Sequence, residues 1–194
     1  MSLSAFGGTA AAGCSYYPGL AFWRTSPPAR FEAQPPPINI DALSLVGEDD
    51  ALVLEFGQLS RVQRGASAPV VIRADTGGHR LMWADGQDIV TADRAGRFSH
   101  ASWNRVTGVA GPWTDRVFSE DGRAGVELAA VWGRSASDLY AVGKAGVILH
   151  FDGTVWRRQP APTVMDLEAV AGNRSSVWIA GAEGTLLTLG GHGP

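Results

Sequence analysis

Two series of glycines recur along this chain of 194 residues with nearly the same spacing. One series comprises Gly8, Gly47, Gly86, Gly133 and Gly172, and the other comprises Gly19, Gly57, Gly96, Gly146 and Gly184. Both keep a period of roughly 39 residues and are lengthened once at the same place, which is typical of stacked structural repeats. The chain is therefore predicted to fold as five copies of one small unit.

The fourth copy shows the internal plan of a unit. Four short runs with apolar residues follow one another at residues 128–133, 138–143, 146–151 and 155–158. The residue two places after each glycine of the second series is always apolar, as expected for strands whose neighbouring side chains point to opposite faces. These positions are Ala21, Leu59, Phe98, Ile148 and Leu186. Each unit is predicted to hold four short strands, and no window sustains the spacing and caps of a helix.

A four-stranded unit repeated radially is the blade of a β-propeller. The predicted fold class is all-β, a single β-propeller domain of about five four-stranded blades whose last blade lacks its outer strand. The predicted blades span about residues 1–40, 41–79, 80–126, 127–165 and 166–194. Small residues in the first strands favour this fold over a β-sandwich or an open stack of sheets. The extra length between Trp103 and Val126 is predicted to be a loop.

Charge and apolar patterning exclude several classes of protein. The chain holds 16 basic and 19 acidic residues, a net charge of −3 without a basic block, so no nucleic-acid partner is predicted. No apolar run approaches the about 18 residues of a membrane-spanning helix. Cys14 is the single cysteine, which excludes an intrachain disulfide. The first residues lack the positive start and apolar stretch of a signal peptide, and the compartment stays open.

One region resembles a known family. Residues 131–143 (VWGRSASDLYAVG) and 146–156 (GVILHFDGTVW) resemble myxobacterial BNR or Asp-box propeller repeats and those of photosystem II assembly factors. The resemblance is specific over residues 128–189 and loose over residues 1–127. It implies a fold more than an activity, because Asp-boxes such as the partial one at residues 152–156 are structural turns in these families. It also suggests a secreted or cell-surface bacterial protein.

The residues capable of catalysis or metal binding form no recognisable set. His100 and His150 each lie four residues after a turn glycine, so they are one position in two blades and are not expected to converge on a metal ion. His79 and His192 lie in glycine-rich loops where no partner is expected. Tyr140 shares a strand position with Trp178, which predicts that Tyr140 is a core residue. No catalytic residue, cofactor or metal is predicted, and the chain is more readily a binding protein than an enzyme.

Loops at one face of the propeller supply the predicted binding residues. Trp113, Asp115 and Arg116 lie together on the inserted segment, with Arg80 and Arg94 on neighbouring loops of the same face. A tryptophan beside an arginine and an aspartate on a loop is typical of a contact with a ligand. These five residues are the predicted ligand-binding set.

Three functions are compatible with this pattern. The favoured one is a non-catalytic scaffold that recognises a protein or a glycan at one face of the propeller. The alternatives are a glycosidase or sialidase-like hydrolase and a structural repeat segment of a larger surface protein. The apolar run from Thr185 to Leu189 is also predicted to be an open strand edge, which self-association or a partner would cover.

Overall fold

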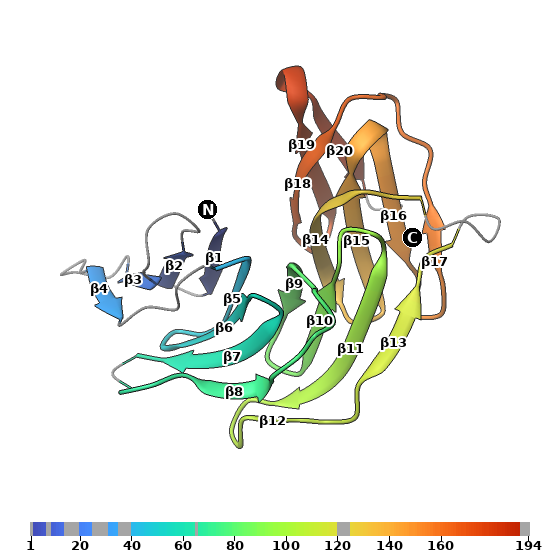
Figure 1. Ribbon diagram of the computed structural model, residues 1–194. Helices are drawn as coiled ribbons and strands as arrows, with labels where there is room; N and C mark the ends of the chain where they lie inside the picture. Colours follow the sequence, from blue (N-terminus) through green and yellow to red (C-terminus); the bar gives the residue numbers. More distant parts are fainter. Residues whose placement is uncertain are drawn as a thin grey trace. The chain divides into compact units, whose positions relative to one another are not determined.

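The computed structural model describes the chain in seven segments, which are residues 2–6, 9–13, 20–24, 31–34, 40–64, 66–119 and 125–190. Residues up to 34 are described by their backbone alone. The described strands form antiparallel sheets in which successive strands are neighbours, except that the last strand of the third sheet pairs with the strand two before it (Figure 1). This meander follows from the short alternating runs joined by tight turns.

The first two sheets have four strands each. The first comprises β1 (Ser2–Phe6), β2 (Thr9–Gly13), β3 (Leu20–Arg24) and β4 (Phe31–Gln34). The second comprises β5 (Ala42–Gly47), β6 (Asp50–Glu55), β7 (Gln58–Gln63) and β8 (Val70–Arg73).

The other three sheets differ in the number of their strands. The third comprises β9 (Leu81–Ala84), β10 (Asp88–Ala92), β11 (Arg97–Asn104), β12 (Val109–Ala110) and β13 (Thr114–Val117). The fourth comprises β14 (Leu128–Ser135), β15 (Asp138–Gly143), β16 (Val147–Phe151) and β17 (Trp156–Arg158). The fifth comprises β18 (Leu167–Gly172), β19 (Ser176–Gly181) and β20 (Leu186–Gly190).

The expected number of blades is corrected by this arrangement. Four sheets have the four or more strands of a complete blade, so the count is four rather than about five. The fifth repeat forms a sheet of three strands within the described chain. The all-β prediction is confirmed. The helical residues among those described are two single 3₁₀ turns, η1 (Lys144–Gly146) and η2 (Ala182–Gly184).

The described turn glycines of the second series adopt the left-handed conformation. Gly57, Gly96, Gly146 and Gly184 have φ angles of 77°, 88°, 69° and 75°, whereas Gly19 lies outside the described residues. At Gly146 the need for glycine is twofold. Positive φ disfavours a side chain, and a Cβ would also collide with the carbonyl oxygen of Thr163.

The prediction of a loop between residues 103 and 126 is wrong in part. The segment forms β12 and β13, which both pair with β11, so the fourth strand of this blade is built in two pieces. Gly111–Trp113 connects them without regular structure. The two short runs satisfy the open edge of β11, and this pairing depends on a neighbouring strand that local sequence signals do not reveal.

The chain divides into two compact units, each with its own core. Unit 1 comprises residues 1–91 and 99–114, and unit 2 comprises residues 92–98 and 115–194. In unit 1 the second sheet packs against the third through a cluster that includes Leu52, Leu54, Leu59, Met82, Ala84 and Ile89. In unit 2 the fourth sheet packs against the fifth around Val142, Ile148, Leu167, Val177 and Ile179.

Two apolar side chains at repeat positions that are buried elsewhere are exposed. Leu186 and Trp178 point away from the cluster of unit 2, whereas their counterparts Ile148 and Tyr140 pack in it. Within the described part of unit 2, the sheet that would cover them is absent, which is why their apolar character does not lead to burial. No helix in the described chain is long and apolar enough to cross a membrane.

Candidate functional site

A carboxylate at the start of the second strand contacts a basic side chain of the third strand in three successive sheets. The basic residue is the one four places after the turn glycine, in the position of the two histidines identified above. The pairs are Asp50 with Arg61 at 2.8 and 2.6 Å, Asp88 with His100 at 2.7 Å, and Asp138 with His150 at 2.8 Å. Each joins two strands of its own sheet.

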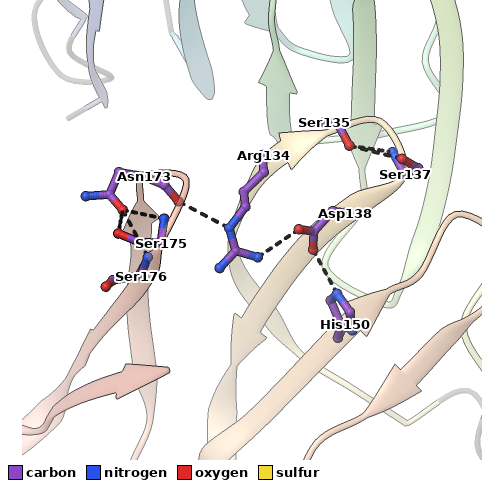
Figure 2. Close-up of polar contacts among 8 residues, drawn as sticks. All are labelled: Arg134, Ser135, Ser137, Asp138, His150, Asn173, Ser175 and Ser176. Atoms are coloured by element: carbon purple, nitrogen blue, oxygen red, sulfur yellow. Dashed lines mark hydrogen bonds and ion pairs between the residues drawn. The ribbon is translucent and has the colours of Figure 1, made fainter. Parts of the chain in front are cut away.

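In the fourth sheet this pair is part of a larger cluster, shown in Figure 2. Arg134 Nη1 donates to Asp138 Oδ2 at 2.7 Å, and His150 Nε2 lies against the other carboxylate oxygen. Burial alone would raise the pKa of Asp138, but the contacts with Arg134 and His150 outweigh it and lower this pKa. Arg134 Nε also donates to the carbonyl oxygen of Asn173, in the turn between β18 and β19 of the fifth sheet, at 3.2 Å. The cluster therefore links the fourth sheet to the fifth by a hydrogen bond.

The pair in the second sheet is the most buried of the three. The side chains of Asp50 and Arg61 are 7% and 11% exposed. The hydrogen bond to Asp50 raises the pKa of Arg61 despite its burial. Arg105 Nε approaches Asp50 Oδ2 to 3.9 Å. Two guanidinium groups therefore share one carboxylate at the floor of a depression in the surface.

This depression, the acidic hollow, has a volume of about 440 Å³. Its lining residues are Glu48, Asp49, Asp50, Arg61, Gln63, Arg105 and Val106. Two of its three carboxylates are paired: Asp50 forms a bidentate contact with Arg61, and Asp49 Oδ1 lies 2.9 Å from Arg64 Nη2. The carboxylate of Glu48 is exposed on the rim. At Glu48 the hollow can attract a cationic group on a ligand.

A second depression, the apolar hollow, is also lined by Arg105 and Val106. Its volume is about 640 Å³. Its lining residues are Gly86, Gln87, Ser102, Trp103, Asn104, Arg105, Val106, Thr107, Val109, Ala110 and Gly111. Arg105 is the one charged residue in this lining. The hollow can accept an uncharged or apolar side chain.

The turn between the hollows is held by short-range hydrogen bonds. Asn104 Oδ1 accepts from the backbone N–H groups of Val106 at 2.9 Å and Thr107 at 3.0 Å. Arg105 Nη1 donates to the carbonyl oxygen of Val46 at 3.0 Å, which fixes the turn to β5. Val106 is 92% exposed at the tip. An apolar side chain on a firmly held turn between two hollows is suited to contact a ligand.

The predicted binding residues of unit 1 contact other residues of the protein. Trp113 is partly buried against the core of unit 1, with the guanidinium of Arg73 at 4.5 Å from its ring centre. Arg80 Nη1 lies 2.8 Å from Asp41 Oδ1. His79, expected to have no partner, is buried with Nδ1 at 2.8 Å from Thr91 Oγ1, so that expectation is wrong.

The predicted binding residues of unit 2 are exposed. Arg116 Nη1 donates to the carbonyl oxygen of Thr154 at 2.9 Å, and its guanidinium lies 5.4 Å from the ring centre of Phe151. The Arg94 side chain and Asp115 are exposed as well. A ligand shared by the five predicted residues stays a prediction.

Sequence reasoning did not identify Arg105 and Val106. A weak signal was present, because Asn104 followed by Gly108 is typical of a tight turn, and an apolar residue inside such a turn is unusual. Among the described residues, no three His, Cys, Asp or Glu side chains are grouped so that they could hold a metal ion.

Comparison with known proteins identifies the fold. No protein-family model and no curated protein sequence matches the chain. The structure is similar to "YCF48 bound to D1 peptide", with a TM-score of 0.63 and 16% identity over 99% of this chain. It is also similar to a streptogramin B lyase structure, with a TM-score of 0.67 and 12% identity over 100% of this chain. Both are β-propellers. The chain spans 63% of the first protein and 69% of the second.

Proposed function

We propose that this protein is a non-catalytic propeller scaffold that binds an extended segment of a partner protein across the acidic and apolar hollows. The observation that carries the proposal is the pair of hollows on either side of the turn at Arg105 and Val106. A propeller of similar fold is described as bound to a peptide, which supports a protein partner.

The lining chemistry defines the segment that would fit. A Lys or Arg side chain of the partner enters the acidic hollow and meets the exposed carboxylate of Glu48. An apolar side chain beside it enters the apolar hollow and packs on Val106 and Val109, which are both exposed. The partner segment therefore combines one basic and one apolar side chain near each other in sequence.

Peptide selection with matched surface variants tests this proposal. Random linear peptides displayed on phage are selected on the wild-type protein, and their affinities are then measured by fluorescence anisotropy. Val106→Asp is expected to weaken binding at least about tenfold, which corresponds to about 1.4 kcal/mol. Val164→Asp is the control, because Val164 is also a strongly exposed valine and lines neither hollow.

Two further results complete the test. Glu48→Gln is expected to weaken the binding of peptides that contain a basic residue and to leave neutral peptides unaffected. The proposal is wrong if no peptide is enriched, or if the enriched peptides bind Val106→Asp and Val164→Asp equally well.

The BNR or Asp-box assignment and a secreted or surface location stay proposals. The Asp152 Oδ1 atom accepts from the backbone N–H groups of Thr154 and Val155, both at 2.9 Å. The hydrogen bonds from Val155 and Thr154 lower the pKa of Asp152. This geometry supports a structural role of the Asp-box type for this turn. A partner at the edge from Thr185 to Leu189, and a glycan as the ligand, are likewise untested.

A further inference from the structure

One arginine of unit 1 carries a charge that no carboxylate of the described residues neutralises. Arg73 ends β8, and its Nε donates to the carbonyl oxygen of Asp75 at 3.0 Å. Arg73 Nη1 is buried and has no acceptor within the described chain. The Asp75 carboxylate accepts from the backbone N–H of Gly77 at 2.7 Å instead. A charged donor that is buried without an acceptor is costly, so the guanidinium favours an anionic acceptor from a ligand.

Trp113 holds this guanidinium in place. The ring centre of Trp113 lies 4.5 Å from Arg73 Cζ, which is a cation–π contact, and the ring packs against the core of unit 1. Both side chains are half-buried. Arg73 Nη2 donates in no hydrogen bond of the described chain and is not among its buried unpaired atoms, so it lies at the surface. The pair therefore presents one charged N–H edge on a fixed support.

The pair of Arg73 and Trp113 adjoins the apolar hollow. Gly111 lines this hollow and Trp113 follows it by two residues, so their Cα atoms are at most about 7 Å apart. Ala110 also lines the hollow and packs against the same core cluster as Trp113. In an extended partner segment, two residues span about 7 Å and place their side chains on one face. The residue two places from the apolar one in the hollow therefore reaches Arg73.

We propose that Arg73 binds a carboxylate of the partner segment, two residues from the apolar side chain that enters the apolar hollow. Arg73 Nη2 donates to a carboxylate oxygen in a charge-assisted hydrogen bond. Trp113 is a positioning residue, because it acts by fixing the guanidinium. This inference rests on the proposed function and adds a third determinant to the same ligand. The partner segment combines a basic, an apolar and an acidic group.

Matched synthetic peptides test this inference on the whole chain. Peptides that depend on Val106 for binding are made with Glu or with Gln two residues from the apolar residue, both with an amidated end. A third version ends at this position with a free carboxylate. Fluorescence anisotropy is expected to show at least about fivefold tighter binding of a carboxylate peptide than of the Gln peptide. The tighter of the two carboxylate peptides identifies a side chain or a chain end as the source. The advantage is expected to shrink as salt is added.

Variants assign the advantage to the arginine. Arg73→Gln is expected to abolish it and to leave the affinity of the Gln peptide unchanged, whereas Arg73→Lys keeps the charge and is expected to retain part of it. Trp113→Leu keeps an apolar side chain against the core and is expected to reduce the advantage, because the guanidinium is no longer held. Arg97→Gln is the control, since Arg97 is an exposed arginine beside Asp93 that lines neither hollow.

The outcomes separate this inference from the proposed function. Peptides that need Val106 but bind equally well with Glu, Gln or a free carboxylate overturn the inference and leave the proposed function standing. A carboxylate advantage that is the same in Arg73→Gln and Arg97→Gln also overturns it. Failure to find any peptide that depends on Val106 contradicts the proposed function itself. Circular dichroism checks the folding of each variant, and Arg73→Lys keeps the comparison open should Trp113→Leu fail to fold.

Discussion

The buried pair of Asp50 and Arg61 is expected to contribute much more to folding than its counterpart in the third sheet. The two pairs occupy the same repeat position. The side chains of Asp50 and Arg61 are 7% and 11% exposed, whereas those of Asp88 and His100 are 25% and 38% exposed. Comparing Asp50→Ala with Asp88→Ala keeps the substitution and its place in the blade, while burial and the basic partner, Arg61 or His100, differ.

The structure sets the size of the two effects. Removing one partner of a buried ion pair costs about 3–5 kcal/mol, because the remaining charge is left uncompensated. Arg61 borders the acidic hollow and its guanidinium lies 5.6 Å from the ring centre of Trp103, so water and the ring offset part of the loss. We expect about 3 kcal/mol for Asp50→Ala. For the more exposed Asp88, about 0–1 kcal/mol is expected.

Urea unfolding followed by far-ultraviolet circular dichroism at neutral pH measures both losses from the shift in midpoint. The double variant Asp50→Leu with Arg61→Met removes both charges and is expected to lie within about 1 kcal/mol of the wild type. Equal losses in Asp50→Ala and Asp88→Ala would refute the argument that burial decides the strength of these repeated pairs.

Three further predictions concern stability. Gly146→Val should lower the melting temperature by an amount equivalent to about 1–3 kcal/mol or more, because φ is positive and the side chain meets the Thr163 carbonyl; an unchanged midpoint would contradict this. Trp156→Ala should lower the free energy of unfolding in urea by about 3 kcal/mol, because the indole stacks on Phe98 with ring centres 4.0 Å apart. A loss below about 0.5 kcal/mol would show that Trp156 is a surface residue. The lowered pKa of Asp138 stabilises the fold above about pH 4, and this stability is lost as the pH falls through the native pKa. Asp138→Asn should therefore lose less stability on acidification than the wild type, and equal slopes would be evidence against the contact.

The candidate site shows where sequence reasoning reached its limit. The position shared by His100 and His150 was visible from the turn glycines, but the facing carboxylates Asp88 and Asp138 were not, because their pairing depends on strand register. Trp113 was expected on a binding surface, yet it packs on the core of its unit with Arg73 over its ring. A tryptophan in an irregular segment can face the core or the solvent, and only the fold of the segment decides which.

By itself the sequence determined the strands and their turns. The runs in residues 128–158 became β14 to β17 with bounds close to those expected, because alternation and positive φ at turn glycines act within a few residues of chain. Tertiary structure alone decided which equivalent residues are buried. Ile148 and Leu186 are both aliphatic and occupy the same repeat position. The fifth sheet covers Ile148, whereas Leu186 is exposed. Burial depends on which surface lies opposite a side chain, and no local pattern contains that information.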